Sequence, residues 1–413
     1  MSNSALVRPG RQADRRAGRA QRSATLAVFI SHGLLFASWT AHIPQVKAHL
    51  GLSDAALGLA LLGAPAGSVA SMLVAARLLP RLGSKRMVQI TLAGYCVAGV
   101  FVGLAGSLPE LFAALFGWGV FQGALDVSMN TQAVTVERAE DRPLMSGFHA
   151  SWSIGAFAGA GIGVAGVAVG LSLSRQLALL AVPVLVVAGA LTARMLPEPA
   201  PVHGQPPGRM KLRVSGPVLM LGAIAFASML CEGASADWAS VYLRGSLHLG
   251  AAAAGVGYAT FSLTMVTVRL LGNRLLARFP RRRLLPVLAT VAAAGFTLGL
   301  AGGSGVSVIA GFGCLGIGLA LVVPSVNSAS GRLPGLSQGT AIATVSAFGW
   351  AGFVCGPPLI GQLASATSLT TALVVLPVLT AWIAVATARS KTLRGPALRS
   401  SEHDGPGTEP AGG

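Results

Sequence analysis

The sequence has little charge: only 10% of its 413 residues are Asp, Glu, Lys or Arg, whereas 53% are hydrophobic. Soluble globular domains carry about 25% charged residues, so a soluble chain of this composition would aggregate. Gly is abundant, at 54 residues, but it has no period of three, which excludes a collagen-like chain. Small residues instead allow membrane helices to approach closely. The composition therefore indicates an integral membrane protein.

Cysteine and catalytic motifs are also scarce. The four cysteines lie in apolar runs without CxxC spacing, so we expect neither a disulfide framework nor a metal site. There is no Walker-type phosphate loop and no cluster of nucleophile, base and orienting group, so we expect no enzyme activity, cofactor or ATP drive. GFGCLG at 311–316 matches GxGxxG, but no strand precedes it, and it indicates close helix packing.

Long apolar runs dominate what is present. An apolar helix of about 20 residues crosses the hydrocarbon core of a bilayer. The chain contains twelve such runs, near 25–47, 55–79, 87–107, 109–136, 144–170, 176–195, 216–243, 251–273, 284–303, 305–331, 337–364 and 368–388. The sequence therefore predicts an all-α, polytopic membrane protein with twelve transmembrane helices.

Two basic segments far apart in the chain are similar. RLLPRLGSKR begins at Arg77 and RLLARFPRRR begins at Arg274, 197 positions later, and each follows an apolar run. The repeat indicates a duplication, hence two pseudo-symmetric six-helix bundles, an arrangement typical of secondary transporters with a solute site between the halves. We expect the repeated charges to lie in cytoplasmic loops: Arg77, Arg81, Lys85, Arg86, Arg274 and Arg278.

The basic residues also predict the orientation of the chain. The net charge is +17, and 26 of the 30 Lys and Arg fall in alternate inter-helix segments and the two termini. This asymmetry follows the positive-inside rule, so both termini should be cytoplasmic and the excess charge should face lipid rather than nucleic acid. The expected organisation is a disordered basic tail at 1–24, a bundle at 25–195, a cytoplasmic linker at 196–215, a bundle at 216–388 and a disordered tail at 389–413.

Several strings are similar to those of one transporter group. Twelve helices, a duplication and matching basic loops resemble the major facilitator superfamily over residues 25–388. Four strings narrow the branch: ALDVSMNTQAV at 124–134, FHASWSIGAFAGAGIG at 148–163, EGASADWASVYL at 232–243 and GWAGFVCGPPLIGQLA at 349–364. They resemble those of the rhizopine-permease group, which is related to fucose permeases. The chain departs from the pattern at Pro80, where the loop signature has Asp, and at His42, where relatives tend to carry Arg.

The resemblance implies proton-coupled transport of a small polar solute by alternating access. It also implies a cavity lined by helices 1, 4, 7 and 10, in a multi-pass protein of the cytoplasmic membrane. The partners would be solute, protons and the lipid bilayer, and we expect the chain to function as a monomer.

Ionisable residues within the apolar runs are the first candidates for the site. Such a group costs at least about 2.5 kcal/mol at the centre of a membrane helix, so it needs a polar cavity. Four lie within the runs: Asp126, Glu232, Asp237 and Arg269. Desolvation favours the neutral form of a carboxyl group, so Asp126 and Glu232 are candidate proton-coupling acids. Asp237 should lie at the outer rim, and Arg269 should either pair with an acid or reach the headgroups.

Amide, imidazole and indole groups complete the predicted site. Gln122 and Asn130 share the helical face of Asp126 at four-residue spacing, and Asn327 follows Asn130 by the repeat distance of 197. Indole rings can pack against the apolar face of a sugar-like ring, and imidazoles can hydrogen-bond to it. The predicted solute-binding residues are Trp39, His42, Gln122, Asp126, Asn130, His149, Trp152, Glu232, Asn327 and Trp350.

Other functions remain open at this level. Proton-driven efflux of drugs or metabolites is the nearest alternative, although the run at 111–123 lacks the Arg and 159–160 lacks the Gly-Pro that such antiporters usually carry. For each aromatic and histidine, simple packing is the competing interpretation. A membrane sensor or scaffold would need a signalling domain, which neither tail is long enough to supply.

Overall fold

The apolar runs form helices because a helix satisfies every backbone polar group internally, which lipid cannot do. The computed structural model describes residues 9–140, 144–197, 215–330, 333, 338–390 and 392–394, and these contain helices and no strand. The first half contains α1 (Pro9–Ser38), η1 (Thr40–His42), α2 (Ile43–His49), α3 (Asp54–Leu61), α4 (Gly63–Val102), α5 (Leu108–Glu140), α6 (Met145–Ala168), α7 (Leu173–Pro183), η2 (Val184–Ala188) and α8 (Gly189–Thr192). The second half contains α9 (Gly216–Gly245), α10 (Ala251–Arg278), α11 (Arg281–Gly302), α12 (Gly305–Leu319), α13 (Val322–Ser330), α14 (Gln338–Ala366), α15 (Leu369–Leu373), α16 (Val375–Arg389) and η3 (Thr392–Arg394).

In the part of the chain that the structure describes, each of the twelve predicted apolar runs is mainly helical. Within the described residues, ten helical segments are long and apolar enough to cross a membrane. The two remaining runs are the part of α4 that follows Gly83 and the long helix α14. The predicted all-α, polytopic class is confirmed.

The tails and basic loops differ from the prediction in detail. Helix α1 begins at Pro9, inside the stretch expected to be a disordered tail, because the Ala, Arg and Gln residues there are good helix formers that continue the apolar helix. The segment expected as the first basic loop is part of α4, which changes direction at Gly83, where φ is +73°. Most of the predicted linker, all of 1–8 and all of 395–413 lie outside the described residues.

Glu137, near the end of α5, and Lys85, in the basic segment of α4, both bind backbone groups. The Glu137 carboxylate accepts the backbone N–H groups of Leu144 at 2.6 Å and Met145 at 2.8 Å, at the start of α6. Lys85 Nζ donates to the Ala193 carbonyl at 2.6 Å. Unsatisfied N–H groups at a helix start attract a carboxylate, which explains why Glu137 binds at the start of α6.

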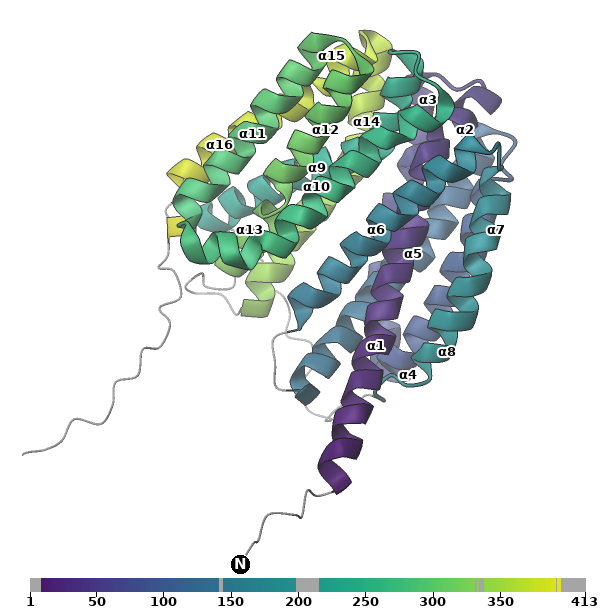
Figure 1. Ribbon diagram of the computed structural model, residues 1–413, viewed down its shortest axis with the longest axis vertical. Helices are drawn as coiled ribbons and strands as arrows, with labels where there is room; N and C mark the ends of the chain where they lie inside the picture. Colours follow the sequence, from purple (N-terminus) through teal and green to yellow (C-terminus); the bar gives the residue numbers. More distant parts are fainter. Residues whose placement is uncertain are drawn as a thin grey trace, which may run out of the picture.

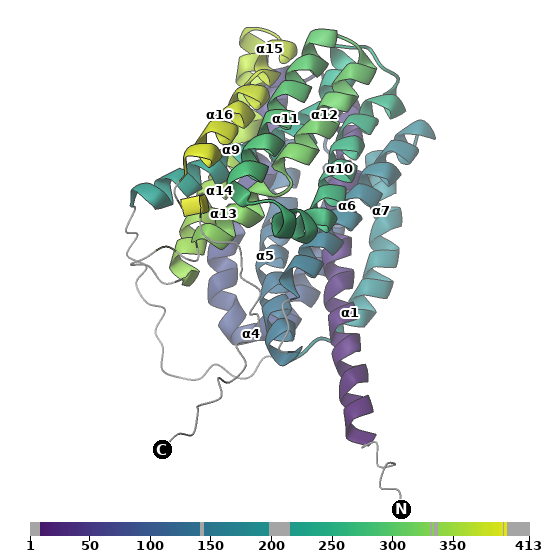
Figure 2. The same ribbon diagram turned by 60° about the vertical axis from the view of Figure 1, so that its left-hand side comes forward.

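Helices α1–α8 and α9–α16 gather into two groups that lie side by side (Figure 1, Figure 2). The same pairing recurs in both: α1 packs on α6 in the first group, and α9 packs on α14 in the second. Glycine permits both contacts. A Cβ added at Gly155 would lie 2.1 Å from the Ile30 carbonyl oxygen, and one added at Gly352 would lie 2.2 Å from that of Phe226. The close approach of backbones therefore depends on the absence of these side chains.

The two groups contact each other near the end that carries α2, α3 and α15, away from the start of α1 (Figure 1). Ser240 Oγ of α9 donates to the Thr40 carbonyl of η1 at 2.7 Å, and the Ala55 amide of α3 donates to Ser365 Oγ of α14 at 2.8 Å. Helix α6 also packs on α10. We call this end, where residues 40–61 meet residues 240–255 and 357–365, the closed end.

Candidate functional site

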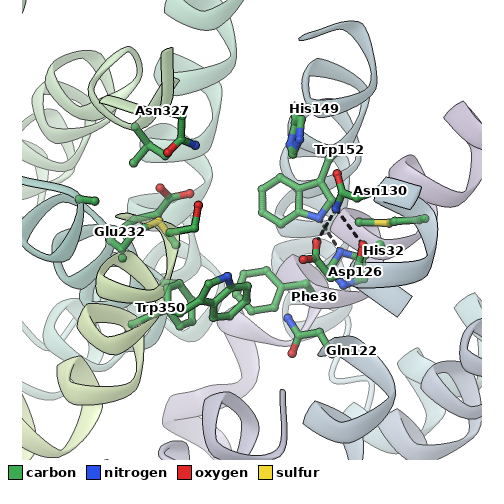
Figure 3. A pocket seen from close by; sticks show the side chains of 18 of the residues that line it. His32, Phe36, Gln122, Asp126, Asn130, His149, Trp152, Glu232, Asn327 and Trp350 are labelled. Atoms are coloured by element: carbon green, nitrogen blue, oxygen red, sulfur yellow. Dashed lines mark hydrogen bonds between the residues drawn. The ribbon is translucent and has the colours of Figure 1, made fainter. Parts of the chain in front are cut away.

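A cavity of about 260 Å³ lies between the two groups of helices (Figure 3). Helices α1, α5 and α6 supply one wall, and α9, α10, α13 and α14 supply the other. The structure brings eight of the ten predicted binding residues to this cavity: Gln122, Asp126, Asn130, His149, Trp152, Glu232, Asn327 and Trp350.

Helix α5 presents the predicted polar stripe to the cavity. Gln122, Asp126 and Asn130 all line it, because four-residue spacing returns each side chain to nearly the same face. Asn130 Nδ2 donates to the Asp126 carbonyl at 2.8 Å and to Asp126 Oδ1 at 3.2 Å. The amide therefore orients the carboxyl group while leaving it on the cavity wall (Figure 3).

Glu232 faces Asp126 from the opposite wall (Figure 3). It is paired with Arg269. Arg269 Nη2 lies 3.7 Å from Glu232 Oε2, and the two side chains are 20% and 15% exposed. Arg269 Nη1 also donates to Ser153 Oγ of the other half at 3.0 Å, and its Nε donates to the Ala320 carbonyl at 3.3 Å. Because α10 continues nine residues beyond it to Arg278, Arg269 lies deep in the helix, and of its two expected arrangements the structure shows pairing with an acid.

His32 is a cavity residue that the sequence interpretation did not select. Trp152 Nε1 donates to His32 Nδ1 at 2.6 Å, so Nδ1 is the acceptor and the ring proton lies on Nε2. The ring of Tyr95 stacks on His32 with centroids 5.3 Å apart. A histidine in an otherwise apolar stretch was a signal for this position. Its hydrogen bond fixes the orientation of the Trp152 indole at the cavity wall.

Aromatic rings form the floor of the cavity towards the closed end. Phe36 lies 6.5 Å from Phe353 and 6.1 Å from Trp152 between ring centroids, and Trp350 lies 5.9 Å from Phe353. Apolar cavity residues resemble core residues in a sequence, so neither these phenylalanines nor the other uncharged lining positions could be selected from it. Those others are Met129, Ala225, Met229, Ala236, Tyr258, Val323, Ser346 and Gly349.

Two predicted binding residues lie elsewhere. Trp39 is buried against Trp118, edge to face, with ring centroids 6.2 Å apart. His42 Nε2 forms a hydrogen bond of 2.9 Å with Gln176 Oε1 inside the first half. Helix α1 ends at Ser38, so both follow the helix that lines the cavity and lie at the closed end. The structure does not bring them to the cavity with the other eight.

The charged groups, amides and rings give the cavity two distinct surfaces. Carboxylate and amide groups of Asp126, Asn130, Glu232 and Asn327 can accept or donate hydrogen bonds, and the aromatic floor can cover an apolar face of a ligand. A few polar groups in an otherwise apolar concavity are the usual composition of a small-molecule site.

The chain matches the Major Facilitator Superfamily over residues 24–329 and 220–408. It is 32% identical over 357 residues to an uncharacterised MFS-type transporter of Yersinia pestis, covering 86% of this chain and 92% of the relative. It is 31% identical to the membrane protein MosC of Rhizobium meliloti, with 84% of each chain covered.

Solved structures have the same fold. The nucleoside transporter NupG superposes with a TM-score of 0.65 at 12% identity, covering 88% of this chain and 98% of NupG. A bacterial homologue of the human lysosomal transporter Spinster, in an inward-facing and occupied conformation, gives a TM-score of 0.65 at 15% identity, covering 91% of this chain and 99% of the homologue. Together with the sequence relatives, these matches show that the chain belongs to the major facilitator superfamily of membrane transporters.

Proposed function

We propose that this protein is a secondary active transporter that carries a small polar, sugar- or polyol-like solute across the cytoplasmic membrane, coupled to protons. The observation that carries the proposal is the position of Asp126 and Glu232. The two acids line one cavity from opposite halves of the molecule (Figure 3). A relative movement of the halves would therefore change the surroundings of both acids at once.

The cavity size and lining support a small polar solute. Its volume of about 260 Å³ is below the roughly 300–1,000 Å³ of sites for drug-sized ligands. The solute would lie on the floor of Phe36, Trp350 and Phe353, with its hydroxyl groups towards Asn130 and Asn327. Bulky hydrophobic cations fit this space less well, so we favour solute uptake over drug efflux.

Proton coupling rests on the two acids. A carboxyl group that lines the cavity can exchange a proton with whichever side of the membrane the site is open to. Glu232 pairs with Arg269, and a proton on Glu232 would weaken that pair. Arg269 also bonds to Ser153 of the other half, so the same proton would affect a contact between the halves.

Alternating access rests on the contacts between the halves. They join at the closed end, through pairs such as Ser240 with Thr40, while the cavity lies between that end and the start of α1. With both termini in the cytoplasm, as the positive charges indicate, the closed end is extracellular and this arrangement corresponds to an inward-facing form. Rocking of the two groups of helices would expose the cavity to each side in turn.

Solute identity can be tested by a thermal-shift screen of the purified protein with sugars, polyols, amino acids and hydrophobic cations. Stabilisation by sugars or polyols would support the proposed class. Stabilisation by hydrophobic cations alone would overturn it and favour efflux.

Coupling can then be tested in proteoliposomes with the stabilising solute and an imposed pH gradient. Asp126→Asn and Glu232→Gln are expected to abolish gradient-driven uptake, because the neutral amides cannot exchange a proton. Glu110→Gln is the matched control, since Glu110 lies at the start of α5, outside the cavity, where it accepts the Gly106 amide. Unchanged uptake in both cavity variants would show that these acids do not couple transport to protons.

A further inference from the structure

Asp237 occupies a second, much smaller cavity of about 20 Å³. It follows Glu232 by five residues in α9, about 140° around the helix, so the two acids face different spaces. The Asp237 side chain is nine-tenths buried, with 9% of its residue surface exposed. Its carboxyl group has no hydrogen bond and no ion pair with any residue that the structure describes. The sequence placed this acid at an outer rim, whereas the structure encloses it.

The small cavity lies on the closed-end side of the aromatic floor. Phe36, Gln122, Trp350 and Phe353 line both cavities and so form the partition between them. On the other side, Ser240, one helical turn after Asp237, makes the 2.7 Å contact with Thr40 of the first half. Asp237 is therefore enclosed between the solute cavity and the contacts that join the halves.

Among the described residues, the elements around Asp237 provide no cation that pairs with its carboxylate. Helix α10 brings Tyr258, whose phenol is within electrostatic range of both Asp237 and Glu232. The other titratable groups near this part of the molecule have partners: Arg269 with Glu232, Lys47 of α2 with Asp54, His42 of η1 with Gln176, His32 of α1 with Trp152 and Asp126 of α5 with Asn130. Helix α14, which packs on α9, carries no acid or base in its sequence apart from Cys355, which is exposed.

We propose that Asp237 is a second proton-binding site, and that the closed end can seal only when this carboxyl group is neutral. An unpaired carboxylate without hydrogen bonds is strongly disfavoured in an enclosed cavity, whereas water stabilises it once the halves separate at this end. Proton uptake from that side would thus precede closure. This inference deepens the proposed proton coupling and rests on it, but it assigns the step to an acid outside the solute cavity.

The expected pH dependence follows from this linkage. The form with its closed end sealed holds one more proton than the form open at that end. A higher pH therefore favours opening, and the ratio of open to sealed molecules rises by up to about tenfold per pH unit, the limit for one proton.

Distance measurements between two spin labels test the inference without any solute. Ala48 and Ala366 are exposed at the closed end, one in each half, and can be replaced by labelled cysteines after Cys355→Ser. In lipid nanodiscs, double electron–electron resonance should show that the population with the longer, open distance increases as the pH rises from about 5 to about 9. Asp237→Asn should keep the short distance at every pH, because the amide is always neutral.

A control variant at an exposed acid accompanies the measurement. Glu110→Gln should retain the wild-type response, because Glu110 lies outside both cavities. A wild-type distance that does not change with pH, or an unchanged response in Asp237→Asn, would overturn the inference. If the label response is as expected but Asp126→Asn and Glu232→Gln still take up solute normally, the site at Asp237 stands and the assignment of the cavity acids fails.

Discussion

The contact of α3 with α14 offers a direct way to change the balance between conformations. Gly58 of α3 lies against Pro357 and Gly361 of α14 at the closed end. A Cβ added at Gly58 would be 2.6 Å from the Pro357 carbonyl oxygen and 3.1 Å from the Gly361 Cα. The three nearest atoms are all backbone atoms of α14, so no side-chain rotation can relieve the overlap. Gly58→Ala should therefore push the two halves apart at this end.

The size of the effect follows from the cost of overpacking. Extra methyl groups in a well-packed interface cost about 1–3 kcal/mol. At 1.4 kcal/mol per factor of ten, this corresponds to a shift of roughly 5- to 150-fold. The overlap involves the other half of the molecule, so most of the cost should fall on the closed arrangement rather than on the folding of the first half.

The Ala48 and Ala366 label pair measures this shift, and thermal unfolding measures folding stability. Gly161→Ala in α6 is the matched control, because no atom lies within 4 Å of the added Cβ. We expect Gly58→Ala to increase the open population while Gly161→Ala leaves it unchanged. A wild-type distance distribution in Gly58→Ala, with normal stability, would refute the reasoning that this contact holds the end closed.

Two other predictions concern the cavity walls. Arg269→Ala and Glu232→Ala should each destabilise the protein by about 1–3 kcal/mol. This is less than the roughly 3–5 kcal/mol lost when a fully buried pair is broken, because both side chains are partly exposed. In a double-mutant cycle of thermal unfolding, strictly additive losses would show that the two side chains do not interact. Trp152→Phe replaces the indole by a smaller aromatic ring and removes the donor to His32, and the lost hydrogen bond alone should cost about 1 kcal/mol. Unfolding at the wild-type temperature would show that this hydrogen bond contributes nothing.

Much of the site was predictable because charge and amide groups are conspicuous in membrane helices. Asp126, Gln122 and Asn130 could be placed on one face of a helix from their spacing alone, and all three line the cavity. Phe36 and Phe353 could not be selected, because an apolar ring at a cavity wall and one in the core look the same in a sequence. Trp39 lies outside the cavity because α1, the helix that lines it, ends at Ser38.

The two acids of α9 show the same limit. The sequence could separate Glu232 from Asp237 by their angle around the helix, but not say what each would face. Glu232 acquires Arg269 from α10, whereas Asp237 is enclosed by rings from α1 and α14 and acquires no partner among the described residues. Each environment is built from other helices, several of which belong to the other half of the chain.

By itself the sequence determined the all-α membrane class, the duplication and the twelve helical runs, because apolar length and charge placement act locally along the chain. Only the tertiary structure decided which end of the two halves is in contact, which acid is paired and which is enclosed. Those properties depend on how the two groups of helices pack against each other. That packing requires close contact between backbones at residues such as Gly58, which the composition of any one helix does not reveal.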